Sequence, residues 1–167
     1  MTIAVESTLT FPPYARRSSQ QHSVWYMGAL FTFLSTGEDT NGDFLLVEAQ
    51  AQAGGEPPPH THAKEDEAYY VLDGSMEFWV GDQHLDAPAG SYVFLPRTVR
   101  HGWKITCGKA RFLFMCWPAG LERYFMEFAQ PAERLEMPPL PDLSKIDMPR
   151  FLKRGHEYGI QFHLGPA

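Results

Sequence analysis

The feature that most constrains the fold is a series of short apolar and aromatic segments, each bounded by glycine or proline. Segments of this kind at regular spacing are typical of the strands of an all-β sandwich or barrel. No long helical pattern separates them, which argues against a parallel sheet built from βαβ units. The predicted strands cover residues 24–34 (one strand or two), 44–52, 68–72, 75–80, 83–86, 91–96, 101–106 and 110–117.

Turn residues between these segments predict how the strands connect. Asp73-Gly74 stands between two apolar runs and predicts a β-hairpin, because this dipeptide adopts the tight turns that hairpins need. Gly81-Asp82 predicts the next turn, and a further hairpin is expected around Gly108. The pattern therefore predicts a compact set of antiparallel strands.

The two ends of the chain differ from this central part. Paired prolines, paired arginines and a run of serine and glutamine near the start suggest an extended arm. The predicted division is an arm at 1–21, a β-barrel at 22–118 and a helical and extended tail at 119–167.

Within the tail, apolar residues at helical spacing predict an amphipathic helix over 120–129 that packs on the barrel or on a second subunit. Prolines keep 136–143 extended. Asp147 is expected to cap a helix over 148–155, with Gly155 near its end. The arm, the segment 24–34 and the Phe-rich helix offer more apolar edge than one barrel covers, so a homodimer is predicted.

Composition limits the classes of partner. The 167 residues suffice for one domain, and a net charge of −6 argues against nucleic acid, which needs clustered basic residues. The N-terminus has neither a signal-peptide pattern nor a transmembrane segment, so a cytoplasmic protein without a membrane partner is expected. Cys107 and Cys116 can form a disulfide, although two free buried thiols are the favoured interpretation.

One histidine pair carries the strongest functional signal. His60 and His62 follow three prolines that favour an extended chain, and alternate residues of a strand point to the same face. Glu67 opens the next apolar run, where a carboxylate has to be solvated, paired or liganded. His101 stands at the start of a later strand. Three imidazoles and one carboxylate suit a divalent Fe, Mn, Co, Ni, Cu or Zn ion and leave coordination positions open.

These residues resemble the two motifs of the cupin superfamily, which includes the RmlC-like proteins. The first motif is matched by Gly54, His60, His62, Glu67 and Gly74, and the second by Gly81, Pro88, Gly90 and His101. One position departs from the family pattern, with Ile105 where asparagine is common, and it is not a ligand position. The resemblance covers residues 43 to 117 and implies a cupin double-stranded β-helix, or jelly-roll, barrel with a C-terminal helical extension.

Strand parity predicts the neighbours of the site. Tyr69 shares a face with Glu67, and Trp103 shares one with His101, so both are candidate pocket residues. Lys64, Glu65 and Asp66 are interpreted as a solvated turn. Eight further side chains are expected to be ordinary surface or core residues: His22, His84, Arg97, Arg100, Phe112, Phe114, His156 and His163.

Within the cupins, the segments around Glu67 and His101 resemble the single-domain quercetin 2,3-dioxygenase-like group. This resemblance implies that a divalent metal binds a deprotonated substrate hydroxyl, that dioxygen cleaves the ring, and that Glu67 also acts as the base. The predicted function is a metal-dependent dioxygenase acting on an aromatic or enolisable hydroxy-ketone. Two alternatives stay open, a non-enzymatic cupin that holds a metal and a small ligand as a sensor or carrier, and a metal-dependent isomerase or hydrolase.

Overall fold

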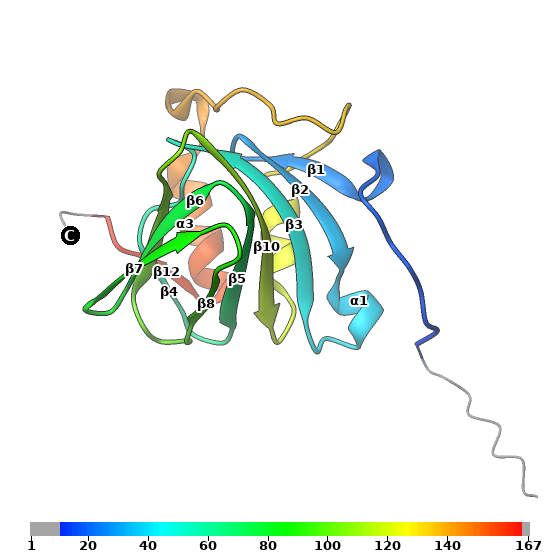
Figure 1. The fold of residues 1–167 in the computed structure, drawn as a ribbon, viewed down its shortest axis with the longest axis horizontal. Helices are drawn as coiled ribbons and strands as arrows, with labels where there is room; N and C mark the ends of the chain where they lie inside the picture. Colours follow the sequence, from blue (N-terminus) through cyan, green and yellow to red (C-terminus); the bar gives the residue numbers. More distant parts are fainter. Residues whose placement is uncertain (1–10, 165–167) are drawn as a thin grey trace, which may run out of the picture.

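The computed structural model describes residues 11–164, which form two antiparallel sheets facing each other and a small helical part (Figure 1). The all-β jelly-roll prediction is confirmed. The strands are β1 (Ser23–Tyr26), β2 (Ala29–Ser35), β3 (Leu45–Gln52), β4 (His60–His62), β5 (Asp66–Asp73), β6 (Ser75–Val80), β7 (Gln83–Pro88), β8 (Tyr92–Leu95), β9 (His101–Ile105), β10 (Lys109–Trp117), β11 (Gln130–Pro131) and β12 (Ile160–Phe162). The helices are α1 (Gly37–Thr40), α2 (Leu121–Met126) and α3 (Met148–Tyr158), with 3₁₀ turns η1 (Gln20–His22) and η2 (Leu143–Lys145).

Each sheet draws on strands far apart in the sequence. The seven-stranded sheet has the order β11-β1-β2-β3-β10-β5-β8, and the five-stranded sheet has the order β12-β4-β9-β6-β7. The alternation in β3 explains its place, because Leu45, Val47, Ala49 and Ala51 are buried while the residues between them face outward. The predicted segment 24–34 is two strands, β1 and β2, which pair with each other.

The predicted hairpin at Asp73-Gly74 is wrong. β5 pairs with β10 and β8 in one sheet, whereas β6 pairs with β7 and β9 in the other. Gly74 instead makes a corner at which the chain passes between sheets, with a φ of 87°. The segment around Gly108 is also a crossing, from β9 to β10. The turn predicted at Gly81-Asp82 does form a hairpin, since Val80 pairs with Gln83.

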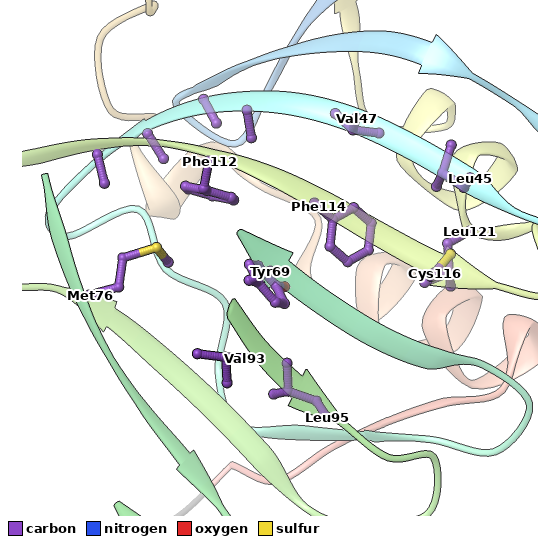
Figure 2. Packing of buried hydrophobic residues seen from close by; sticks show 14 of the residues in the cluster. Leu45, Val47, Tyr69, Met76, Val93, Leu95, Phe112, Phe114, Cys116 and Leu121 are labelled. Atoms are coloured by element: carbon purple, nitrogen blue, oxygen red, sulfur yellow. The ribbon is translucent and has the colours of Figure 1, made fainter. Parts of the chain in front are cut away.

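The core lies between the two sheets and is rich in aromatic rings. Tyr69 lies among Phe112, Phe114, Val93 and Leu95 (Figure 2). Its ring centroid is 5.3 Å from that of Phe114 and 5.6 Å from that of Phe112. Phe112 and Phe114 are therefore core residues, as predicted.

The C-terminal residues extend both sheets. β11 pairs with β1, and β12 pairs with β4, the strand that carries His60 and His62. The α3 helix begins at the predicted cap, where the Asp147 carboxylate accepts the amide hydrogen of Arg150. It ends later than predicted, at Gly159 with a φ of 92°, whereas Gly155 is an interior packing position. The α2 helix is shorter than the predicted 120–129.

Several surface predictions can be compared with the described residues. Phe125 of α2 packs on Tyr26 and Phe31 of the same chain, so this part of the expected dimer edge is covered. The homodimer and the three-part division of the chain stay predictions. Cys107 and Cys116 are both free thiols, but only Cys116 is buried, since Cys107 lies in the exposed loop before β10. Between residues 11 and 164, no helix has the length and apolar character that crossing a membrane requires.

Candidate metal centre

The four predicted ligands meet between the two sheets. His60 and His62 lie on β4, and His101 lies on the neighbouring β9, where it pairs directly with His60. Glu67 comes from β5 of the opposite sheet. One ligand atom from each of the four residues lies within 4.8 Å of the others, and all four side chains are buried. Residues distant in sequence therefore form one compact donor set.

Nitrogen and oxygen atoms face one another at the centre of this set. Glu67 Oε1 lies 3.1 Å from His62 Nε2, and Glu67 Oε2 lies 3.2 Å from His101 Nε2. Neither His101 Nε2 nor Glu67 Oε2 has a hydrogen-bond partner among the described residues. Buried lone pairs that point at one another are costly unless a proton or a metal ion lies between them. The donor set therefore fits a cation.

Backbone carbonyls fix the tautomers of two of the histidines. His60 Nδ1 donates to the Pro58 carbonyl at 2.9 Å, and His101 Nδ1 donates to the Val99 carbonyl at 3.0 Å. A carbonyl only accepts, so Nδ1 carries a hydrogen in both rings. Nε2 is therefore the nitrogen that each ring can offer to a metal ion.

Electrostatics divide the site into neutral and charged groups. Burial lowers the pKa of His60 to about 4, so this ring is neutral near pH 7. Burial also lowers the pKa of His62, but the Glu67 and Glu65 carboxylates outweigh it and raise the pKa to about 9. Burial raises the pKa of Glu67, and the His62 and His101 imidazoles outweigh that effect and hold it below its ordinary value. The carboxylate is therefore ionised, and His62 would have to lose a proton for its Nε2 to bind a metal ion.

Comparison with known families agrees with this geometry. A family model described as the cupin domain matches residues 42–117, which contain all four ligand candidates and both sheets' central strands. Residues 42–117 of the chain therefore form a cupin domain. Both sequence motifs that resembled this family lie within the matched residues.

Individual relatives of this cupin are distant. It is 22% identical over 135 residues to a quercetin 2,3-dioxygenase of Bacillus subtilis, a match that covers 81% of this chain. The chain spans only about 40% of the length of that relative.

Two solved structures illustrate the fold. KdgF from a Halomonas species is 16% identical with a TM-score of 0.57, covering 66% of this chain and 99% of its own. An RmlC-like cupin from Shewanella frigidimarina is 19% identical with a TM-score of 0.56, covering 66% of this chain and 96% of its own. At such identities, the likeness shows the fold alone.

The predicted pocket residues of this cupin lie inside the barrel. The rings of Tyr69 and Trp103 lie 6.1 Å apart, and Trp103 also contacts Phe112. Burial raises the pKa of the Tyr69 hydroxyl, and the charge on Glu67 raises it further, so the hydroxyl keeps its proton. Trp103 Nε1 is buried and has no hydrogen-bond partner within residues 11–164. An indole N–H is a donor only, so this atom can donate a hydrogen bond to an oxygen atom of a ligand.

The interpretation of residues 64 to 66 as a solvated turn is wrong for Glu65. This side chain is only 5% exposed, and its Oε2 lies 3.6 Å from His62 Nδ1. Asp66 points to the other side and binds the backbone and guanidinium of Arg97. The alternation of side-chain directions along a strand could have predicted this burial, because Glu65 stands two residues before Glu67 and four before Tyr69.

The other singled-out side chains lie outside the donor set. His84 is exposed on β7 beside Glu77, and His163 Nε2 bonds to the Thr61 hydroxyl at 2.8 Å. Arg97 is engaged with Asp66, and Arg100 is exposed. His22 is half-buried and His156 is exposed.

Proposed function

We propose that this cupin is a metal-dependent dioxygenase that acts on an aromatic or enolisable hydroxy-ketone. The observation that carries the proposal is the convergence of unpartnered nitrogen and oxygen atoms beside an aromatic interior. The similarity to a protein named quercetin 2,3-dioxygenase supports the same reaction class. A substrate with an acidic hydroxyl and a neighbouring carbonyl matches both the donor set and the apolar walls.

In this proposal, His60, His62, His101 and Glu67 hold a divalent transition metal. When bound, the metal supplies open coordination positions and a positive charge that stabilises an enolate oxygen. The chain's own contribution is geometric. Two carbonyl-bound rings keep Nε2 directed inward, and the aromatic walls exclude water, which strengthens electrostatic interactions in the site.

Glu67 is also the proposed base. Its carboxylate is ionised in the buried site, so Oε1 or Oε2 can accept the hydrogen of the substrate hydroxyl. The Tyr69 hydroxyl and the free Trp103 N–H are proposed to bind the substrate's other oxygen atoms.

Oxygen consumption by defined holo-protein tests the proposal. The full chain is loaded with one divalent ion at a time, from Fe, Mn, Co, Ni, Cu and Zn, and metal content is measured. Flavonols, β-diketones and related enols are then screened in an oxygen electrode. Turnover with a redox-active ion supports the dioxygenase. Failure of every loaded form with every substrate overturns it, and stoichiometric zinc alone favours a binding or hydrolytic protein.

Two substitutions separate the roles at the site. His60→Ala should abolish metal binding, whereas His156→Ala removes an exposed imidazole of α3 that lies outside the four-residue site and should leave metal binding unchanged. Glu67→Gln should lower turnover much more than substrate affinity, because the base acts in the transition state. Equal losses in both would favour a carrier or sensor over an enzyme.

A further inference from the structure

A fifth buried polar side chain adjoins the proposed metal centre. Glu65 is 5% exposed, and its Oε2 has no hydrogen-bond partner among the residues that the structure describes. A buried carboxylate without a partner is strongly disfavoured. Its closest titratable neighbour within the described residues is the His62 ring, whose Nδ1 lies 3.6 Å from Oε2. The burial of Glu65 therefore calls for an explanation inside the site.

The three histidines of the site are not equivalent. His60 and His101 each direct Nδ1 to a backbone carbonyl. The Nδ1 atom of His62 has no hydrogen-bond partner within the described part of the chain, and only Glu65 faces it. A shortening of about 0.5 Å brings this pair within ordinary hydrogen-bond distance. Glu65 thus occupies the place that a carbonyl occupies at the other two rings.

We propose that Glu65 is the positioning residue for His62, accepting the Nδ1–H so that Nε2 faces the metal. The inference rests on the proposed metal centre. A carboxylate partner fixes the tautomer and orientation of an imidazole and makes it a stronger ligand than a carbonyl partner does. His62 is accordingly the most strongly donating of the three rings.

Metal competition measures the effect directly. Glu65→Gln keeps the size of the side chain but loses its charge, and its affinity for Co(II) or Zn(II) in a chelator competition should fall about 10-fold to 100-fold. Asp66→Asn is the matched control, since it removes an adjacent carboxylate outside the site, and it should bind as wild type. Glu65→Asp, which keeps the charge but shortens the reach, should fall between the two.

Proton NMR of the zinc-loaded protein provides a readout that a general structural defect does not produce. The exchangeable Nδ1–H resonance of His62 should shift in Glu65→Gln, while those of His60 and His101 stay in place. If Glu65→Gln binds metal as wild type with an unchanged His62 resonance, the positioning role is overturned. If His60→Ala also retains metal, the proposed centre itself fails, so the two failures are distinguishable.

Discussion

Gly155 of α3 lies directly against the ring of Phe162 on β12. A Cβ added at Gly155 would come within 2.6 Å of the ring. Phe162 in turn lies 5.8 Å from the His60 ring, and it pairs with His60 across β4 and β12. Gly155→Ala should destabilise the fold by about 1–3 kcal/mol through overpacking and should weaken metal binding. Urea unfolding and metal competition measure the two effects.

A second substitution isolates the cause. Phe162→Ala removes the ring that the new methyl group meets, so Gly155→Ala in that background should lose its cost. In that background, Gly155→Ala should even raise the free energy of unfolding by up to about 1 kcal/mol, because alanine is a better helix former than glycine. An equal cost of Gly155→Ala in both backgrounds would contradict the contact with Phe162.

Trp103→Phe tests the free indole donor. The substitution keeps an aromatic wall but removes the buried N–H, so a substrate that uses this donor loses one hydrogen bond. Affinity for a flavonol or β-diketone should fall about tenfold. Quenching of ligand or protein fluorescence in an anaerobic titration measures it.

Trp79→Phe is the matched control for that experiment. Trp79 is 40% exposed and stacks on His84, on the outer face of the five-stranded sheet. It should bind substrate as wild type, and both variants should keep their full metal content. Wild-type affinity in Trp103→Phe would remove the indole from the proposed pocket.

The site could be predicted from sequence because its signals are local. His60 and His62 share a face by parity, and the spacing to Glu67 is contained in one motif. The same alternation of side-chain directions could have predicted that Glu65 is buried. The charged residues around it instead suggested exposure to solvent, and Glu65 meets its partner His62 only once the turn between them has folded.

Features that depend on contacts between residues far apart in the sequence could not be predicted from local patterns. The turn at Gly74 encodes a sharp bend, but local chemistry does not specify whether the strands on either side pair or separate into two sheets. The three-residue strand β12 forms only because β4 offers it a free edge. Both Gly155 and Gly159 are possible helix ends by composition, and the packing of Phe162 on Gly155 distinguishes them.

The pair of Arg16 and Asp39 predicts a pH dependence of stability. The guanidinium makes two bonds to the carboxylate, at 2.8 and 2.9 Å. This contact, together with bonds from Thr36 and against the effect of burial, lowers the Asp39 pKa from 3.8 to about 2. A lowered pKa means that the stabilisation is present above pH 3.8 and is lost as the pH falls through 2.

Asp39→Asn should therefore cost about 1 kcal/mol at neutral pH. The difference in unfolding free energy between wild type and variant should shrink as the pH falls from 4 towards 2. Urea unfolding across this range measures it, with Asp82→Asn as a control for an exposed acid elsewhere. A gap that stays constant over the range would show that the ion pair contributes no pH-dependent stability.

A comparison of Gly74 with Gly108 separates two costs of replacing a glycine, the strain of a left-handed backbone and a steric clash. Its φ is 87°, and a Cβ there would lie 2.6 Å from the Lys109 carbonyl oxygen, a backbone atom that cannot move aside. Gly108 has a nearly equal φ of 85° but no atom within 4 Å of a built Cβ. Gly108→Ala should cost only the left-handed backbone, about 1–2 kcal/mol. Gly74→Ala should cost a further 1–3 kcal/mol or so through the clash. Urea unfolding at one temperature, with unchanged denaturant dependence, measures both, and equal losses would mean that the sheet corner relaxes around the new methyl group.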